Sequence, residues 1–285
     1  METYTEKIIF ITGAASGIGR ELACQLAEKG AVVVATDING AAVEAVADEI
    51  QKQGGNVVSY QLDVTDYQAV KTLIRYIISR YGQLDYAFCN AGISVGGEVR
   101  DVPMPDWHKV LAVNLNGVIH TATEAYKVMV KQGFGHVVTT ASLAGLVYQP
   151  TLIPYVTTKH AVVAFSRSLR LEGKALGVKV SAFCPGFIAT NIYESSLMSG
   201  STIDEAMKLN PFKLVAVEDA VQMLLKGVAA NKELILLPFY SHALSWLTKH
   251  AYPLIRPLML TNLTRYRQLR KVPVEAEEPV DASTT

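Results

Sequence analysis

Short apolar runs recur along the first 240 or so residues, and segments with helical periodicity separate them. The runs contain few polar residues, as expected of parallel strands that are buried on both faces. The expected strands are 7–11, 31–36, 56–62, 84–89, 137–140, 178–183 and 234–237. The expected helices are one ending at Gly30, then 40–53, 66–81, 105–131, one that carries Tyr155 and runs to about Leu176, and 218–230. This alternation predicts an α/β fold with one Rossmann-type, doubly wound parallel sheet of about seven strands and helices on both faces.

Local residues mark some of these boundaries. Asp66 precedes the helix expected at 66–81 and is a good N-cap residue, while Gly82 follows it and is a typical helix stop. We therefore expect this helix to begin and end at those two positions.

The turn after the first expected strand is rich in glycine and leads directly into a helical pattern. It spans residues 12–19, although its spacing is not the common Gly-x-Gly-x-x-Gly. Glycines in this context let the backbone turn tightly and approach a pyrophosphate, which then lies at the helix N-terminus. The turn predicts dinucleotide binding by Gly13, Ser16, Gly17, Ile18 and Gly19.

An acidic residue, Asp37, follows the second expected strand. A carboxylate at this place accepts hydrogen bonds from both hydroxyls of an adenosine ribose, and it would repel a 2′-phosphate. Ile38 and Asn39, which follow it, supply no compensating cation. The sequence therefore favours NAD over NADP as the cofactor.

Tyr155 and Lys159 are four residues apart in an expected helix, which places both side chains on one face, one turn apart. A free tyrosine has a pKa of about 10, which is too high for easy proton exchange near neutrality. A fixed ammonium nearby favours the phenolate and lowers that pKa. The pair is a candidate acid/base unit for a hydroxyl or carbonyl oxygen, although most such pairs on helices are solvated neighbours.

The composition of the 285 residues narrows the class of protein. Half of them are hydrophobic and 18% are charged, which supports a large core without cross-links. The formal net charge of zero argues against nucleic-acid binding through bulk electrostatics. Cys24, Cys89 and Cys184 lack metal-ligand spacing, so we expect buried thiols in a reducing cytosol and no metal site. The N-terminal residues are typical of a first strand rather than a signal peptide, and no run of ~20 apolar residues is long enough to span a membrane.

Several short motifs follow one another in order along the chain. They are Thr12-Gly13-x-x-x-Gly17-x-Gly19, Asp63-Val64, Asn90-Ala91-Gly92, Asn114, Ser142, Tyr155-x-x-x-Lys159 and Pro185-Gly186. Together they resemble the classical short-chain dehydrogenase/reductase family over roughly residues 5–240, and no core catalytic position departs from that pattern. The resemblance implies a nicotinamide dinucleotide cofactor and a homodimer or homotetramer.

The resemblance also implies roles for individual residues. Tyr155 would be the general acid/base, Lys159 would lower its pKa and hold the nicotinamide ribose, and Ser142 would hydrogen-bond the substrate oxygen. Asn114 would hold a water molecule that links Lys159 to solvent. The implied cofactor contacts are Asp63 at the adenine amino group, the Val64 backbone beside it, Asn90 close to the adenosine ribose and Thr190 at the nicotinamide carboxamide, with Ala91, Gly92, Pro185, Gly186 and Ile188 completing the set.

Some of these residues have structural alternatives that the sequence leaves open. Asn114 could bond only to backbone at a helix kink, and Thr190 could cap a helix. Asn90 could chiefly bond neighbouring backbone, and Ser142 without its neighbours would be an ordinary serine at a strand end.

Segment 187–216 lacks a regular period and carries apolar and aromatic side chains, which favours a flexible lid over the substrate. The expected pocket is apolar, with Val95, Leu143, Leu146, Tyr148, Leu152, Phe187 and Tyr193. The sequence therefore predicts an oxidoreductase that transfers a hydride between NAD(H) and a lipophilic secondary alcohol or ketone, such as a steroid, a retinoid or a long-chain alcohol. A non-catalytic NAD-binding redox sensor and an NADPH-dependent carbonyl reductase are the alternatives.

Residues 239–274 extend beyond the expected dinucleotide-binding and catalytic domain, 1–238. They contain no acidic residue and combine cations with aromatic and aliphatic side chains. Pro253 and Pro257 should break any single long helix. Such a segment could lie in a membrane interface, which would give a cytoplasmic protein peripheral membrane contact, or could pack over the substrate pocket or a neighbouring subunit. Residues 275–285 are acidic and polar, and we expect them to be disordered.

Overall fold

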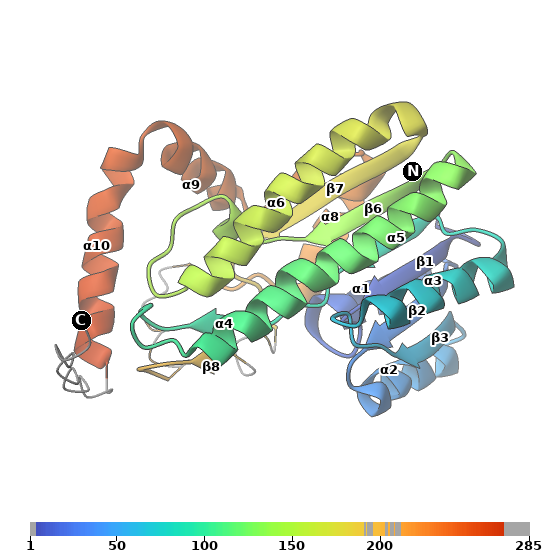
Figure 1. Cartoon of the computed structure of the whole chain (residues 1–285), viewed down its shortest axis with the longest axis horizontal. Coiled ribbons are helices and arrows are strands. Elements are labelled where there is room, and N and C mark those ends of the chain that lie inside the picture. The colour runs from blue at the N-terminus through green and yellow to red at the C-terminus, as the bar shows by residue number, and fades with distance from the viewer. Residues whose placement is uncertain are drawn as a thin grey trace, which may run out of the picture.

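The computed structural model describes residues 4–190, 192, 196–202, 205, 208 and 212–270. A seven-stranded sheet lies at its centre, with every strand parallel to its neighbours and the order β3-β2-β1-β4-β6-β7-β9 (Figure 1). The strands are β1 (Ile8–Thr12), β2 (Val32–Asp37), β3 (Asn56–Gln61), β4 (Tyr86–Cys89), β6 (Gly135–Thr140), β7 (Val178–Pro185) and β9 (Leu234–Leu237). The predicted Rossmann-type fold is confirmed.

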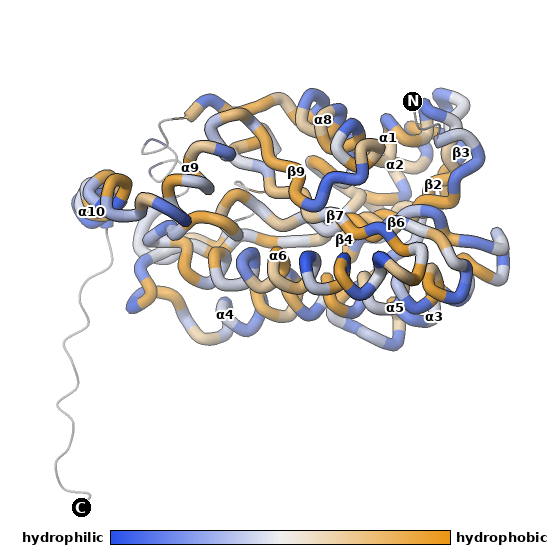
Figure 2. Tube along the Cα trace, turned by 90° about the horizontal axis from the view of Figure 1, so that it is seen from above, coloured by the Kyte–Doolittle hydropathy of each residue, from blue (hydrophilic) through white to orange (hydrophobic). Residues whose placement is uncertain are grey.

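Helices cover both faces of this sheet, so the molecule has three layers (Figure 2). One face carries α1 (Gly17–Glu28), α2 (Gly40–Lys52) and α8 (Val217–Ala229). The other carries α3 (Tyr67–Tyr81), α5 (Gly117–Gln132) and α6 (Ile153–Gly173), which continues into a 3-10 turn at Lys174–Leu176.

The central strands are apolar throughout because each supplies two cores. In β1, Ile9 and Ile11 enter the core beneath α1, α2 and α8, whereas Ile8 and Phe10 enter the core beneath α3, α5 and α6. Successive side chains of a strand point to opposite faces, so a strand between two helical layers has no polar face.

Helix α3 shows why its predicted boundaries hold. The Asp66 side chain accepts hydrogen bonds from the backbone amides of Gln68 and Ala69, which would otherwise lack partners in the first turn. Gly82 ends the helix in the left-handed conformation, with a φ of +79° that glycine adopts without strain.

The helical region predicted for 105–131 is confirmed, but it is not one regular helix. It consists of α4 (Met104–Leu111), a single π-helical turn (Ala112–Asn116) and then α5. Asn114 lies in this π turn, and π turns within α-helices are frequent at functional sites.

A second, two-stranded sheet was not predicted. β5 (Val95–Gly96) pairs with β8 (Leu197–Met198), so a loop after β4 is joined to segment 187–216. Within the same segment, an isolated parallel bridge pairs Ile188 with Val215. The flexible lid stays a prediction, and several of its residues lie outside the described ones.

After β9 the chain forms α9 (Phe239–His250) and α10 (Tyr252–Leu269), which extend beyond the sheet (Figure 1). The helices separate at Ala251, two residues before Pro253, but the break expected at Pro257 is wrong, because Pro257 lies inside α10. A proline there removes only the bond to the carbonyl of Pro253, next to the helix start, and buried Ile255 and Tyr266 hold the helix on either side.

The described helices include none with the length and apolar character needed to cross a bilayer. Peripheral membrane contact through 239–274 stays a prediction, as does the domain boundary at residue 238. The expected disorder of 275–285 concerns residues outside the described ones.

Candidate active site

A cavity of about 650 Å³ opens at the carboxyl ends of the central strands. This is where open α/β sheets bind their ligands. The predicted site residues that line it are Gly13, Ser16, Gly17, Ile18, Asp37, Asp63, Val64, Asn90, Ala91, Gly92, Ser142, Tyr155, Lys159, Pro185, Gly186, Ile188 and Thr190. Gly19 and Asn114 are predicted site residues that do not line it.

The glycine turn brings backbone to the cavity where side chains would not fit. Gly13 and Gly17 have φ values of +68° and +52°, and a Cβ on Gly13 would stand 2.8 Å from Cα of Ala91. A Cβ on Gly19 would stand 1.9 Å from the carbonyl oxygen of Gly13, so Gly19 allows the turn to close onto α1. Ser16 caps α1 without a side-chain hydrogen bond to the helix. The N-terminus of α1 is therefore available to a pyrophosphate.

Asp37 ends β2 with its carboxylate fixed at the cavity. Oδ2 accepts a hydrogen bond from the amide of Ala15 at 3.1 Å, and Oδ1 accepts one from the amide of Asn39 at 3.0 Å. Each carboxylate oxygen can accept more than one bond, so both remain able to meet ribose hydroxyls. The next side chain, Ile38, is 64% exposed and also lines the cavity.

Asp63 is held by a local turn at the same end of the cavity. Its Oδ1 accepts bonds from both the amide and the hydroxyl of Thr65, each at 2.8 Å. Val64, the next residue, also lines the cavity, which is compatible with the implied contacts to an adenine ring.

The side chain of Asn90 bonds to the ends of the neighbouring strands. Nδ2 donates to the carbonyl oxygens of Thr12 and Gly13, both at 3.2 Å, and Oδ1 accepts from the hydroxyl of Thr140 at 3.1 Å. These bonds join β1, β4 and β6 beside the glycine turn. They support the structural alternative for Asn90, which holds the turn in place.

Tyr155 and Lys159 lie near the start of α6, one turn apart, and both line the cavity. The Lys159 ammonium is 5.5 Å from the centre of the Tyr155 ring and donates to the Thr140 carbonyl oxygen at 2.8 Å. Ser142, just after β6, caps a 3-10 turn (Leu143–Gly145) by accepting from the amide of Ala144 at 3.1 Å. The three side chains thus come from the end of β6 and the first turns of α6.

Burial shifts the pKa values of both Tyr155 and Lys159. Desolvation raises the pKa of the Tyr155 phenol, and the hydrogen bond with the Ser142 side chain acts in the opposite direction. Desolvation also lowers the pKa of Lys159 to about 8. The sequence led us to expect a lowered tyrosine pKa. In the protein alone it is raised instead, because desolvation outweighs the hydrogen bond with Ser142.

Asn114 is fully buried in the π turn and bonds to backbone. Its Oδ1 accepts from the amide of Ile93 at 2.8 Å, and its Nδ2 donates to the Ile93 carbonyl oxygen at 2.9 Å. Its Nδ2 also donates to the Thr158 hydroxyl, over a longer 3.4 Å. The side chain thus bonds mainly, but not only, to backbone, and the water-holding role stays a prediction. Thr190 lines the cavity beside Gly17, while the residues needed to test it as a helix cap lie partly outside the described ones.

The substrate end of the cavity differs from the sequence expectation. Leu143, Leu152 and Phe187 line it, and Tyr193 lies outside the described residues. Three other residues expected in the pocket do not line the cavity. Val95 is buried in a small core under β5, Leu146 packs on the core beneath α6, and Tyr148 stacks on His160 and meets the Tyr252 ring 5.3 Å away.

The sequence interpretation also missed several lining residues. They are Ile38, Leu62, Ile93, Ser94, Lys109, Val113, Thr140, Ala141, Ala144, Gln149 and Ile192. Some are the immediate neighbours of motif residues and could have been found from that. Ser94, Lys109 and Gln149 belong to irregular segments or an exposed helix, where no pattern in the chain indicated them.

Comparisons with known proteins agree with this architecture. The family model described as short chain dehydrogenase matches residues 7–199. The structure is similar to that of a short chain dehydrogenase/reductase from Burkholderia phymatum in complex with NAD, with a TM-score of 0.77 and 25% identity, covering 97% of this chain and all of that one.

Three curated relatives show the range of the likeness. "Probable oxidoreductase EphD" of Mycobacterium tuberculosis is 37% identical over 203 residues, 71% of this chain but 34% of that protein, so the chain spans about a third of its length. Cyclohexanol dehydrogenase of an Acinetobacter species is 33% identical, covering 77% of this chain and 86% of that protein. A 3beta-hydroxysteroid dehydrogenase of Mediterraneibacter gnavus is 36% identical, covering 69% and 71%. Since the family model spans well over half of the sequence, this chain belongs to the short-chain dehydrogenase/reductase family.

Proposed function

We propose that this protein is an NAD-dependent oxidoreductase that transfers a hydride between NAD(H) and a lipophilic secondary alcohol or ketone. The observation that carries the proposal is the meeting of Tyr155, Ser142 and Lys159 in the cavity that the glycine turn also lines. Two relatives are named as dehydrogenases of cyclohexanol and of a 3beta-hydroxysteroid, and one similar structure contains NAD, which supports both the cofactor and the substrate class.

The residues present fit a dinucleotide. The glycine turn leaves room for a pyrophosphate at the start of α1, where a Cβ on Gly13 would crowd the backbone. Asp37 offers two oriented carboxylate oxygens to a ribose, and Ile38 beside it carries no charge. The cations among the lining residues, Lys109 and Lys159, lie on α4 and α6, away from β2. The proposal therefore favours NAD over NADP.

Tyr155 would move the proton and Ser142 would hold the oxygen. In reduction, the Tyr155 hydroxyl donates its proton to the ketone oxygen while a hydride joins the carbonyl carbon. In oxidation the phenolate takes the proton of the alcohol as the hydride leaves. The raised pKa of the buried phenol keeps it protonated and ready to donate near neutral pH. A nicotinamide bound beside Tyr155 would supply or accept the hydride, and the positive charge of its oxidised ring would favour the phenolate.

The apolar residues at the far end of the cavity support a lipophilic substrate. Leu143, Leu152, Phe187 and Ile192 line this region, and burial of apolar ligand surface against such side chains is favourable by roughly 25 cal/mol per Å². Ser94 and Gln149 add hydrogen-bonding groups that would fix the orientation of a substrate.

The test compares the wild type with Tyr155→Phe. Purified protein is assayed against cyclohexanol, 3β-hydroxysteroids and long-chain secondary alcohols, with NAD and NADP side by side, and NADH affinity is measured by fluorescence titration. We expect turnover with NAD, a loss of roughly 100-fold to 10,000-fold in Tyr155→Phe, and NADH affinity within about twofold of the wild type.

Three results would contradict the proposal or part of it. NADH binding without turnover on the whole panel would favour a redox sensor. A faster reaction with NADPH on the same ketones would favour a carbonyl reductase, and turnover limited to small polar polyols would refute the lipophilic substrate.

A further inference from the structure

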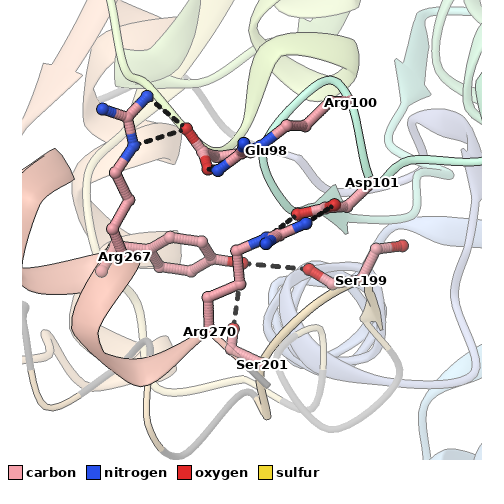
Figure 3. Close-up of polar contacts among 8 residues, drawn as sticks. Glu98, Arg100, Asp101, Ser199, Ser201, Arg267 and Arg270 are labelled. Carbon is pink, nitrogen blue, oxygen red and sulfur yellow. Dashed lines mark hydrogen bonds and ion pairs between the residues drawn. The ribbon is translucent and has the colours of Figure 1, made fainter. Parts of the chain in front are cut away.

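Helix α10 is attached to the rest of the protein by a group of polar contacts near its C-terminal end (Figure 3). The residues of α10 that are buried are Ile255 and Tyr266, while Leu254, Leu258 and Leu260 are exposed. Little apolar surface of α10 is therefore removed from water, and the polar contacts carry much of its attachment.

Arg270, directly after α10, and Asp101 form a paired contact. Nε of Arg270 donates to Oδ2 of Asp101 at 2.7 Å, and Nη2 donates to Oδ1 at 2.5 Å. The two side chains are only 11% and 4% exposed. The Arg270 guanidinium holds the pKa of Asp101 below its usual range, so this carboxylate stays charged at neutral pH. Removal of either partner would leave the other charge buried and unpaired.

Glu98 forms a second contact with α10 from the same loop. Its Oε1 accepts two bonds from Arg267, at 2.6 and 2.8 Å, and its Oε2 accepts two from Arg100, at 2.7 and 3.2 Å. The Glu98 side chain is 9% exposed, whereas the two arginines are about half exposed. Glu98 is thus fixed between its own loop and α10 (Figure 3).

Tyr266 connects α10 to the segment that contains β8. Its hydroxyl donates to the Ser199 carbonyl oxygen at 3.0 Å and accepts from the Ser201 hydroxyl at 3.0 Å. The side chain is 2% exposed, so these bonds lie out of water. We refer to the contacts of Tyr266, Arg267 and Arg270 with residues 98–101 and 199–201 as the α10 clamp.

The clamped segments lie next to residues that line the cavity. Ser94, which lines the cavity, accepts a bond from Leu197 in β8 at 3.0 Å, and Ser199 donates to Gly96 in β5 at 2.9 Å. Gly97 donates to the Thr151 carbonyl oxygen at 2.7 Å, next to the lining residue Leu152. Through β5 and β8, the clamp is therefore linked by backbone hydrogen bonds to the segments that carry the lining residues Ser94 and Leu152.

We propose that Tyr266, Arg267 and Arg270 are positioning residues for the substrate end of the active site. They hold β5 and β8 together from outside, and so fix Ser94 and Leu152 against the substrate. This inference rests on the proposed function for its catalytic consequence. Its structural consequence, that α10 orders the β5–β8 sheet, depends on the contacts alone.

The test uses Arg270→Gln in the full chain, with Arg265→Gln as the matched control. Arg265 is an exposed cation of the same helix and has no ion pair in the described part of the chain. Amide hydrogen exchange is followed at 93–102 and 196–202, KM and kcat are measured with the best substrate of the screen, and NADH affinity is titrated. In Arg270→Gln we expect faster exchange in both segments, a KM raised tenfold or more, kcat changed less than KM, and NADH affinity within twofold. Arg265→Gln should match the wild type.

Two further variants keep the inference testable if Arg270→Gln misfolds. The reversed pair, Asp101→Arg with Arg270→Asp, should recover most of the lost protection and affinity. Tyr266→Phe removes only the hydroxyl and should speed exchange at 196–202. The inference is overturned if Arg270→Gln and Tyr266→Phe match Arg265→Gln in exchange and KM, or if NADH affinity falls as much as substrate affinity. Lack of turnover in the wild type would refute the proposed function instead, and the exchange comparison would still decide whether α10 orders the β5–β8 sheet.

Discussion

The buried amine of Lys159 should make the stability of the protein alone depend on pH. Lys159 is only 3% exposed, and its hydrogen bond to the Thr140 carbonyl oxygen offsets only part of the lost hydration. Burial therefore lowers the pKa of the amine from 10.5 to about 8. Between these two values the unfolded chain binds more protons than the folded one. The free energy of unfolding therefore rises with pH across this window.

The size of the effect follows from the shift. The difference of 10.5 − 8 = 2.5 pKa units corresponds to roughly 3.5 kcal/mol at about 1.4 kcal/mol per unit. Roughly 2 to 3 kcal/mol of this would be gained between about pH 7 and pH 10, because the unfolded amine is still partly protonated at pH 10. The free energy of unfolding should rise as the folded protein loses the proton of the Lys159 amine.

The assay compares the single variant Tyr155→Phe with the double variant Tyr155→Phe/Lys159→Met by urea unfolding, without cofactor, at steps from about pH 7 to pH 10. Phenylalanine at position 155 removes the phenol, whose own raised pKa would otherwise add a second pH-dependent contribution. Methionine at position 159 keeps an unbranched side chain without the charge. The single variant, which retains Lys159, should gain roughly 2 to 3 kcal/mol relative to the double variant over this range. A difference that stays constant within about 0.5 kcal/mol would refute the argument from burial.

Two other predictions concern the cofactor end of the cavity. Asp37→Ala combined with Ile38→Arg should raise the ratio of kcat/KM for NADP over that for NAD by roughly 100-fold or more, because repulsion of the 2′-phosphate by a carboxylate, worth a few kcal/mol, is replaced by attraction to a guanidinium. Steady-state kinetics with both cofactors checks this. An unchanged ratio would show that Asp37 does not contact the ribose. Gly19→Ala puts a Cβ 1.9 Å from the Gly13 oxygen and should weaken NADH binding more than tenfold in a fluorescence titration. Gly82→Ala is the control, since its Cβ meets open space and its φ of +79° costs only about 1 kcal/mol, so NADH binding should not change.

The order of strands and helices could be predicted because each buried parallel strand leaves its own local pattern in the sequence. Uninterrupted apolar runs such as 31–36 mark strands between two helical layers, and the carboxyl ends of parallel strands share one edge. Asp37, Asn90 and Ser142 each follow such a run, so their convergence on one cavity follows from topology. The four-residue spacing of Tyr155 and Lys159 similarly depends only on helix geometry.

Other features depend on contacts between distant parts of the chain. The expected pocket residue Tyr148 turns away because it packs against Tyr252 of α10, and no periodicity indicates that contact. The pairing of β5 with β8 joins two-residue strands about a hundred positions apart, too short to leave a pattern. The direction of the Tyr155 pKa depends on how much water the fold excludes, which spacing alone does not reveal.

The ion pairs of α10 join residues that are 169 positions apart in the sequence. Strands β6, β7 and β9 lie between them in the sequence, and closure of so long a segment costs chain entropy. We therefore expect these pairs to form after most of the sheet has assembled. During refolding, the ability to bind a dinucleotide should thus return before the substrate end acquires its final shape. The cofactor end and the substrate end of one active site would then reach their native structures at different times.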